Sequence, residues 1–226
     1  MKRKPVSDRW SLVFQPRRLL GLCYALGVML WVVYALVGSA LMLNHKMNGT
    51  MRHQTLTPDE LTYESFRNYD DDPWSTAPDD RDNWYLSTDN DPHILWEGEQ
   101  AYVETVRLQV EQLLPPGSVT LYYLKPGQTD YRETQKIFAW QDTDGSYVFE
   151  LGGITVSGLR IDPDSVGGVP TLFQGIELNP ATPWYDRFIP NGGQWLLLLF
   201  VPALAVAAIA LVGSLLHKEE PDAPRD

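Results

Sequence analysis

The chain has 226 residues, enough for one modest domain with anchors, which argues against a multidomain enzyme. It carries 29 acidic and 18 basic side chains, so its formal net charge is -11 at pH 7. This charge argues against nucleic acid and anionic lipid as partners and leaves cations, basic proteins and neutral glycans. The one cysteine, Cys23, has no second cysteine with which to form an intramolecular disulfide.

Two long apolar runs predict transmembrane helices over residues 19–43 and 195–216, since neither contains Asp, Glu, Lys or Arg. The first would make a helix of roughly 37 Å, against a hydrocarbon core of about 30 Å. Pro202 interrupts the second, but membrane helices tolerate proline. A cleaved signal peptide is the alternative for the first run and a buried soluble helix for the second. The length of both runs favours membrane helices.

The charges of the flanking segments predict the orientation in the membrane. The leader, residues 1–18, has six basic side chains against one acidic side chain, whereas residues 44–194 have 10 basic and 24 acidic ones. By the positive-inside rule the leader is cytoplasmic, the central segment is extracytoplasmic, and the tail of residues 217–226 returns to the cytoplasm. The sequence therefore predicts a protein of the cytoplasmic membrane, with the bilayer as a partner and both termini cytoplasmic.

The central segment divides into three parts. Residues 44–82 are polar and acidic and lack an apolar period, so we expect a linker, with a short helix over about Pro58 to Phe66 that is capped by Thr57 and Glu60. Over residues 83–179, short apolar stretches recur at intervals of about 10 to 15 residues between turn residues, which is typical of an antiparallel two-sheet sandwich, jelly-roll-like in form. Residues 180–194 are expected to return the chain to the membrane.

About eight strands are expected in this sandwich. Alternation of apolar and polar residues over Tyr102–Val110 places Tyr102, Val106 and Leu108 on one face. Ile137–Trp140 and Tyr147–Leu151 are expected to form a hairpin around an Asp-Gly turn. The other predicted strands are residues 84–87, 94–96, 119–124, 156–162 and 171–178.

Three sequence segments carry a resemblance to a known class of module: Asn83-Trp-Tyr-Leu-Ser-Thr-Asp-Asn-Asp-Pro-His-Ile94, Gly145-Ser-Tyr-Val-Phe-Glu-Leu151 and Leu159-Arg-Ile-Asp-Pro163. Residues 83–179 resemble the extracytoplasmic β-sandwich modules of bacterial cell-envelope proteins, which are often attached to membrane glycosyltransferases or polysaccharide polymerases. No transferase is attached here. The resemblance therefore implies an accessory or binding part, with envelope glycan and a membrane glycosyltransferase or transporter as the expected partners.

Arg160 and Asp162 form the first candidate ligand-binding pair. Two positions apart on a predicted strand, their side chains project from the same face, where they could bind the hydroxyl groups of a sugar. The alternative is a structural role, which the sequence favours: Asp162 before Pro163 opens a turn, and a neighbouring carboxylate holds Arg160.

Aromatic side chains are the second group of candidates, because flat rings beside Asp and Asn are surfaces on which sugar rings stack. Trp96, Tyr122 and Trp140 are the three predicted to bind ligand. The alternative is that these rings fill the core, since each can bury roughly 150 to 250 Å².

For metals and catalysis the sequence offers no specific motif. Asp70–Asp72, Asp89 with Asp91, and Asp142 with Asp144 supply oxygen ligands for a structural calcium ion, but none fits an EF-hand loop, so no metal or cofactor is predicted. Hydrolase, metalloprotease and nucleotide-binding motifs are absent from the sequence.

We therefore expect a non-enzymatic two-pass membrane protein. Its sandwich would bind envelope glycan or support a membrane partner in surface polysaccharide synthesis or export. One alternative is a structural subunit without a glycan ligand, in which small residues such as Gly21, Gly27 and Gly38 pack the helices. The other is an enzyme that acts on envelope glycan through a carboxylate pair.

Overall fold

A computed structural model describes residues 16–69, 84–183 and 185–217 of the chain. The chain divides into two units, residues 1–41 with 183–226, and residues 42–182. Residues 1–15 of the predicted leader, most of the predicted tail, and Asp70–Asp72 lie outside the described residues.

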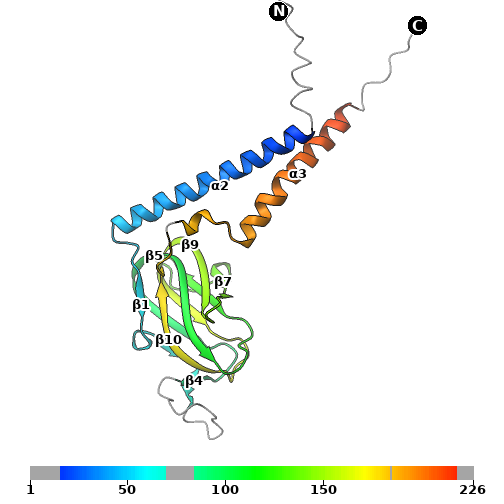
Figure 1. Cartoon of the computed structure of the whole chain (residues 1–226). Helices are drawn as coiled ribbons and strands as arrows, with labels where there is room; N and C mark the ends of the chain where they lie inside the picture. The colour runs from blue at the N-terminus through cyan, green and yellow to red at the C-terminus, as the bar shows by residue number, and fades with distance from the viewer. Residues whose placement is uncertain (1–15, 70–83, 184, 218–226) are drawn as a thin grey trace, which may run out of the picture. The chain divides into compact units, whose positions relative to one another are not determined.

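The first unit consists of two apolar helices (Figure 1). Helix α2 spans Pro16–Met47, its last six residues belonging to the second unit, and α3 spans Gly192–His217. A short 3-10 helix, η4, covers Asp186–Phe188. Both α2 and α3 are long and apolar enough to cross a membrane, and nearly all their large apolar side chains are exposed. The two predicted membrane segments, residues 19–43 and 195–216, fall within them.

Within this unit the two helices meet at small and polar residues. The Tyr24 hydroxyl donates a hydrogen bond of 2.8 Å to the carbonyl oxygen of Leu199. Gly27 lies against Pro202, where an added Cβ would stand only 3.3 Å from the proline ring. Gly38 lies against the guanidinium of Arg187. Small residues thus permit close contact of α2 with α3 at Gly27 and with η4 at Gly38. Among the described residues, none has an atom within 4 Å of a Cβ added at Gly21.

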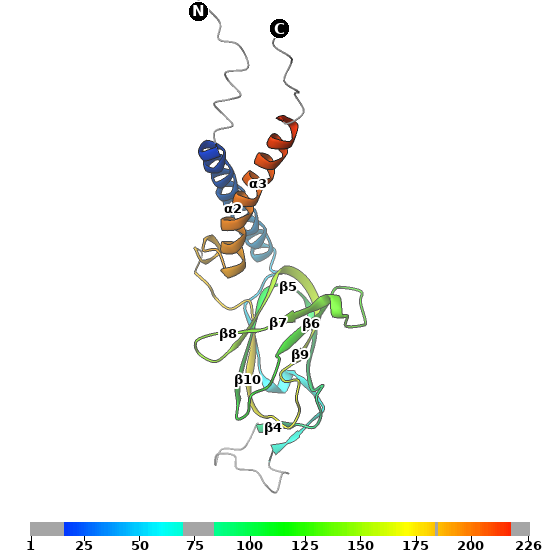
Figure 2. The same ribbon diagram turned by 90° about the vertical axis from the view of Figure 1, so that its right-hand side faces the viewer.

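The described part of the second unit forms an antiparallel β structure of ten strands (Figures 1 and 2). The hydrogen-bonded order is β3-β4-β10-β5-β9-β6-β7, with β1 on β10, β2 on β5 and β8 on β9. The strands are β1 (Gln54–Leu56), β2 (Thr62–Glu64), β3 (Phe66–Asn68), β4 (Trp84–Ser87), β5 (His93–Gln112), β6 (Thr120–Leu124), β7 (Lys136–Phe138), β8 (Trp140–Gln141), β9 (Tyr147–Asp162) and β10 (Pro170–Leu178). The predicted mainly β, antiparallel fold is confirmed.

Two long strands, β5 and β9, connect the two layers of the sandwich. Near its start β5 pairs with β2 and with the end of β9, and β9 in turn pairs with β6. Near its end β5 pairs with β10 and with the start of β9. The register of β5 on β9 shifts twice: between Glu97 and Ala101 the extra residues lie in β5, and between Val103 and Thr105 they lie in β9. The larger apolar core lies between the layers and includes buried residues such as Val106, Phe149 and Ile161. A smaller cluster contains Tyr69 and Trp84.

The predicted linker of residues 44–82 is partly wrong. Strands β1, β2 and β3 lie within it, and they pair with β10, β5 and β4 respectively. Leu56, at the end of β1, is completely buried in the core. The capped helix is shorter than expected: the 3-10 helix η1 spans only Pro58–Glu60, and the Glu60 carboxylate accepts the backbone N–H of Thr57 at 2.8 Å.

Four of the expected strands are joined into two longer ones. Residues 94–96 and 102–110 are parts of β5, while 147–151 and 156–162 are parts of β9. Between the two parts of β9, Gly152 and Gly153 have φ values of 72° and 86° and form a bulge inside the strand. The predicted hairpin of Ile137–Trp140 with Tyr147–Leu151 is confirmed only next to the Asp-Gly turn, where Trp140 and Gln141 pair with Val148 and Tyr147. Ile137 and Phe138 belong to β7 and pair with β6 instead.

Candidate functional site

The three predicted aromatic ligands differ in exposure. Trp96 and Tyr122 are only 6% and 7% exposed, whereas Trp140 is 48% exposed. Trp96 lies two positions after Ile94 on β5, so both side chains point inward, and Trp96 packs in the core. Tyr122 is covered on its outer side by Arg160 and Lys136. Stacking of a sugar ring on Trp96 or Tyr122 is therefore excluded in this conformation, because neither ring presents a free face. The exposed ring of Trp140 is still available for stacking on a sugar ring.

Arg160 and Asp162 lie together on the outer face of β9, as their spacing predicts. Arg160 Nε and Nη2 donate to the two carboxylate oxygens of Asp162 at 2.8 and 3.1 Å. Nη2 also donates to Asp91 Oδ1 at 2.6 Å. The guanidinium lies 5.2 Å from the centre of the Tyr122 ring, a cation–π distance. These contacts support the structural role for Arg160, because its donors are already engaged by carboxylates.

Burial governs the protonation of this pair. The side chain of Asp162 is 10% exposed and that of Arg160 is 21% exposed. Burial raises the pKa of Asp162 above its usual value, and the hydrogen bonds from Arg160 offset only part of this. For Arg160 burial acts to lower the pKa, but the hydrogen bonds and charges of Asp162 and Asp91 raise it overall. The ion pair is thus a largely desolvated one, in which each partner depends on the other.

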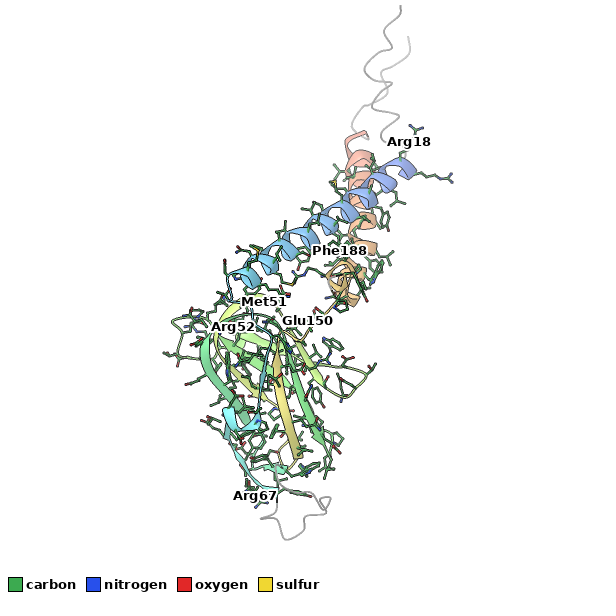
Figure 3. The ribbon with its side chains drawn as sticks, turned by 60° about the vertical axis from the view of Figure 1, so that its left-hand side comes forward. Arg18, Met51, Arg52, Arg67, Glu150 and Phe188 are labelled. Atoms are coloured by element: carbon green, nitrogen blue, oxygen red, sulfur yellow. The ribbon has the colours of Figure 1, made fainter. Side chains whose placement is uncertain are left out.

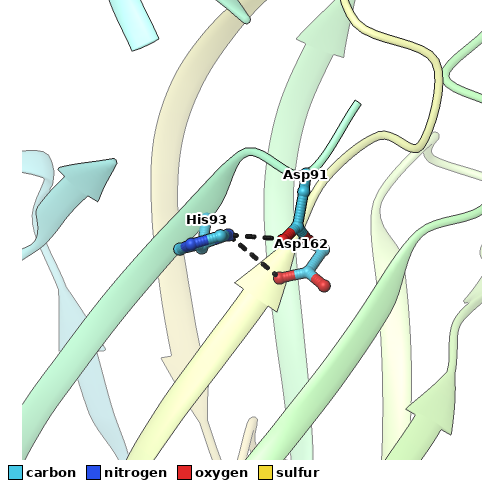
Figure 4. Close-up of side chains that lie close together, drawn as sticks. All are labelled: Asp91, His93 and Asp162. Atoms are coloured by element: carbon cyan, nitrogen blue, oxygen red, sulfur yellow. Dashed lines mark ion pairs between the residues drawn. The ribbon is translucent and has the colours of Figure 1, made fainter. Parts of the chain in front are cut away.

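His93 adjoins this pair and was not predicted as a site residue (Figure 4). Its Nδ1 lies 3.8 Å from Asp91 Oδ1 and 3.9 Å from Asp162 Oδ1, and its Nε2 lies 3.5 Å from Glu64 Oε2. The pairing of Ile94 with Ile161 places His93 next to Asp162 across β5 and β9. This neighbourhood depends on strand pairing between residues almost seventy positions apart, which the sequence pattern did not reveal.

A pocket of about 190 Å³ opens at one end of the sandwich, where β5 leaves the ladder. Gly98 to Gln100 bulge outward between the paired residues Glu97 and Ala101, and this leaves space beside Trp96. Figure 3 shows Arg52 at the same end of the sandwich as Met51, far from Arg67. The pocket is lined by Thr50, Arg52, Gln54, Trp96, Gly98, Glu99, Gln100, Ala101 and Leu178. We refer to it as the Trp96 pocket.

Three features of the Trp96 pocket suit a small polar ligand. Its side chains offer donors from Arg52 and the two glutamines and acceptors from Glu99. Arg52 Nη1 lies 3.9 Å from Glu99 Oε2, so the two charges balance, and both side chains are mostly exposed. Gly98 lies against the edge of the Trp96 indole, and an added Cβ would overlap this ring.

A second depression of about 430 Å³ lies along the end of β5 and the following loop. Its polar side chains already bond to the protein. Tyr147 donates to Gln112 Oε1 at 3.0 Å, Gln112 Nε2 donates to the carbonyl of Pro163 at 3.0 Å, and Gln141 Nε2 donates to that of Gly145 at 3.1 Å. Fewer free groups therefore face a ligand here than in the Trp96 pocket.

The described acidic pairs considered for calcium have protein partners. Asp142 and Asp144 hold the guanidinium of Arg107 at 3.0 and 3.3 Å. Asp89 accepts the Ser65 hydroxyl at 2.8 Å and the backbone N–H of Asp91 at 2.9 Å. These contacts fit the turns expected for such residues.

No family model and no curated protein matches the chain. Two solved structures are similar to part of it. One is the family 32 carbohydrate-binding module of C. perfringens NanJ in complex with galactose, with 13% identity, a TM-score of 0.37, and coverage of 56% of this chain and 98% of that one. The other is CBM86, a low-affinity xylan-binding module from Roseburia intestinalis, with 17% identity, a TM-score of 0.35, and coverage of 57% and 95%. Neither likeness assigns a ligand to this chain.

Proposed function

We propose that this chain is a two-pass protein of the cytoplasmic membrane whose extracytoplasmic β-sandwich binds a neutral glycan in the Trp96 pocket. The observation that carries the proposal is the pocket itself, with an arginine, two glutamines and a glutamate around the edge of an indole. Sugar hydroxyls both donate and accept hydrogen bonds, and these side chains supply the matching groups. The function is binding rather than catalysis.

The size of the Trp96 pocket supports a single sugar residue as the occupant. Sites for drug-sized ligands measure roughly 300 to 1,000 Å³, and this pocket has about 190 Å³. The rest of a glycan would then extend into solvent. The balanced charges of Arg52 and Glu99, together with the acidity of residues 44–194, favour a neutral glycan over an anionic one.

Two membrane anchors would fix the orientation of the sandwich, whereas one would suffice for tethering. This supports an accessory role beside a membrane glycosyltransferase or transporter in the synthesis or export of surface polysaccharide. The contacts of Gly27 and Gly38 show how closely the anchors and their connecting segment pack.

Glycan binding is tested with the full chain in lipid nanodiscs, on an array of neutral and anionic bacterial glycans, followed by calorimetry of the best ligand. Gly98→Ala should weaken binding about tenfold, because the new Cβ displaces the Trp96 indole into the pocket. Arg52→Ala should weaken it by a similar factor. Arg132→Ala, an exposed change outside the pocket, is the control and should leave affinity unchanged. Saturable binding that both pocket variants retain would exclude the Trp96 pocket, and a chain that binds no glycan favours the structural-subunit function.

The orientation is tested by cysteine labelling in a Cys23→Ser background. A membrane-impermeant maleimide should label Thr129→Cys, at an exposed position of the sandwich, in intact cells. It should label Ser7→Cys in the leader only after the cells are permeabilised, because the basic leader is retained in the cytoplasm. The reverse pattern would place the sandwich in the cytoplasm and contradict the proposed topology.

A further inference from the structure

Three potential metal ligands converge on the outer face of the sandwich from separate segments. Asp91 lies in the loop before β5, His93 is the first residue of β5, and Asp162 is the last residue of β9. One ligand atom from each lies within 4.8 Å of the others. Figure 4 shows the imidazole ring edge directed at both carboxylates.

The imidazole of His93 lacks the contacts that a buried polar ring usually makes. Its side chain is 16% exposed, and its Nδ1 is shielded from solvent. Among the described residues Nδ1 has no hydrogen-bond partner, although two carboxylate oxygens stand 3.8 and 3.9 Å away. Buried polar atoms in native proteins almost always have a partner, so this nitrogen points to an occupant between it and the carboxylates.

The charges around His93 also leave room for a cation. Three carboxylates, those of Glu64, Asp91 and Asp162, face the ring, and Arg160 is the one cation paired with them in the described chain. With a neutral imidazole the group is therefore short of positive charge. Arg160 donates to the same Oδ1 atoms that face the ring. Each carboxylate oxygen has a second lone pair, so both can still bind a metal ion.

We propose that His93 Nδ1, Asp91 and Asp162 bind a divalent cation of the zinc class. An ion between the three atoms would lie about 2 to 2.5 Å from each, close to the roughly 2.0 to 2.2 Å of Zn–N and Zn–O bonds. An imidazole nitrogen in a three-ligand set selects zinc, cobalt or nickel over calcium and magnesium, which prefer six or more oxygen ligands. A water molecule would complete the tetrahedron. The ion would tie the loop before β5 to the end of β9, independently of the Trp96 pocket.

The test uses the full chain in detergent, stripped of metal by a chelator and titrated near neutral pH with Zn²⁺ by calorimetry and with Co²⁺ by visible absorption. We expect one ion per chain and cobalt bands typical of tetrahedral coordination. His93→Gln and Asp91→Asn should each weaken binding about tenfold or more. His53→Gln is the matched control and should bind as the unchanged chain does, since His53 contacts Asn179 instead.

Asp91→Asn is the variant expected to stay folded, because the Asp91 side chain is 66% exposed and its change leaves the core untouched. Loss of binding in this variant is therefore not explained by unfolding. The proposal is overturned if the chain binds neither metal with a defined stoichiometry, or if either folded variant keeps the original affinity. Equal loss in His53→Gln would also overturn it, because binding would then lie elsewhere.

Discussion

Arg160→Met is expected to lower the free energy of unfolding of the sandwich by about 3 to 5 kcal/mol. The side chain of Asp162 is only 10% exposed beside Arg160. The change removes the two hydrogen bonds that Arg160 donates to its carboxylate. Breaking a desolvated pair on one side is costly because the remaining charge stays buried and uncompensated. Urea unfolding of the full chain, with chelator present and followed by tryptophan fluorescence, measures the loss.

A double variant separates buried charge from lost packing as the cause. Arg160→Met with Asp162→Leu should recover most of the lost stability, since replacing both partners of a buried pair with apolar side chains is often close to neutral. Arg132→Met, at an exposed position, should change stability by less than about 0.5 kcal/mol. If the double variant is as unstable as the single one, the cation–π contact of the Arg160 guanidinium with Tyr122 contributes more than its pairing with Asp162.

The sequence predicted the elements whose patterns are local. Each predicted membrane segment is a long run without Asp, Glu, Lys or Arg, and both segments lie within helices of the structure. The strand of residues 84–87 was predicted with its observed bounds, and the Asp-Gly turn marked the hairpin of β8 and β9. Local backbone preference and apolar periodicity are sufficient for such elements.

Elements that depend on tertiary pairing were missed. Strands β1, β2 and β3 have three residues each, which is too short for a recognisable alternation of apolar and polar residues. They form because their backbones hydrogen-bond to β10, β5 and β4 respectively. The register shift between Val103 and Thr105 changes which side chains of β5 face the core. Val103 and Val106 are therefore both fully buried, although one is an odd and the other an even position of the strand. A strict period of two cannot anticipate such a bulge.

The candidate site was predicted in part for the same reasons. The spacing of Arg160 and Asp162 on one strand placed them on one face, which the structure bears out. The inward direction of Trp96 could have been inferred from Ile94, two positions earlier on the same face. The meeting of His93 with Asp162, and the pocket beside Gly98, follow from the register and bulges of β5 on β9, which no local pattern encodes.

Asn179→Ala is expected to lower the free energy of unfolding by about 3 to 5 kcal/mol. The Asn179 amide donates to the carbonyls of Tyr102 and Arg52 at 2.8 and 3.1 Å, and its oxygen accepts the backbone N–H of Glu104 at 2.8 Å. The residue is 7% exposed, so alanine would leave these backbone groups without their side-chain partner at a buried position. Its φ of 52° adds strain for alanine, since asparagine adopts this conformation more readily.

Asn179→Gly distinguishes the two causes, because glycine adopts the positive φ without strain but makes none of the amide's hydrogen bonds. We expect glycine to recover only about 1 kcal/mol relative to alanine. Recovery to the original stability would instead make backbone strain the main cause. The hydrogen bonds also hold the chain next to the Trp96 pocket, since Arg52 and Leu178 line it. Asn179→Ala should therefore weaken glycan binding even where the sandwich stays folded, whereas Gln174→Ala, on an exposed part of β10, should change neither property.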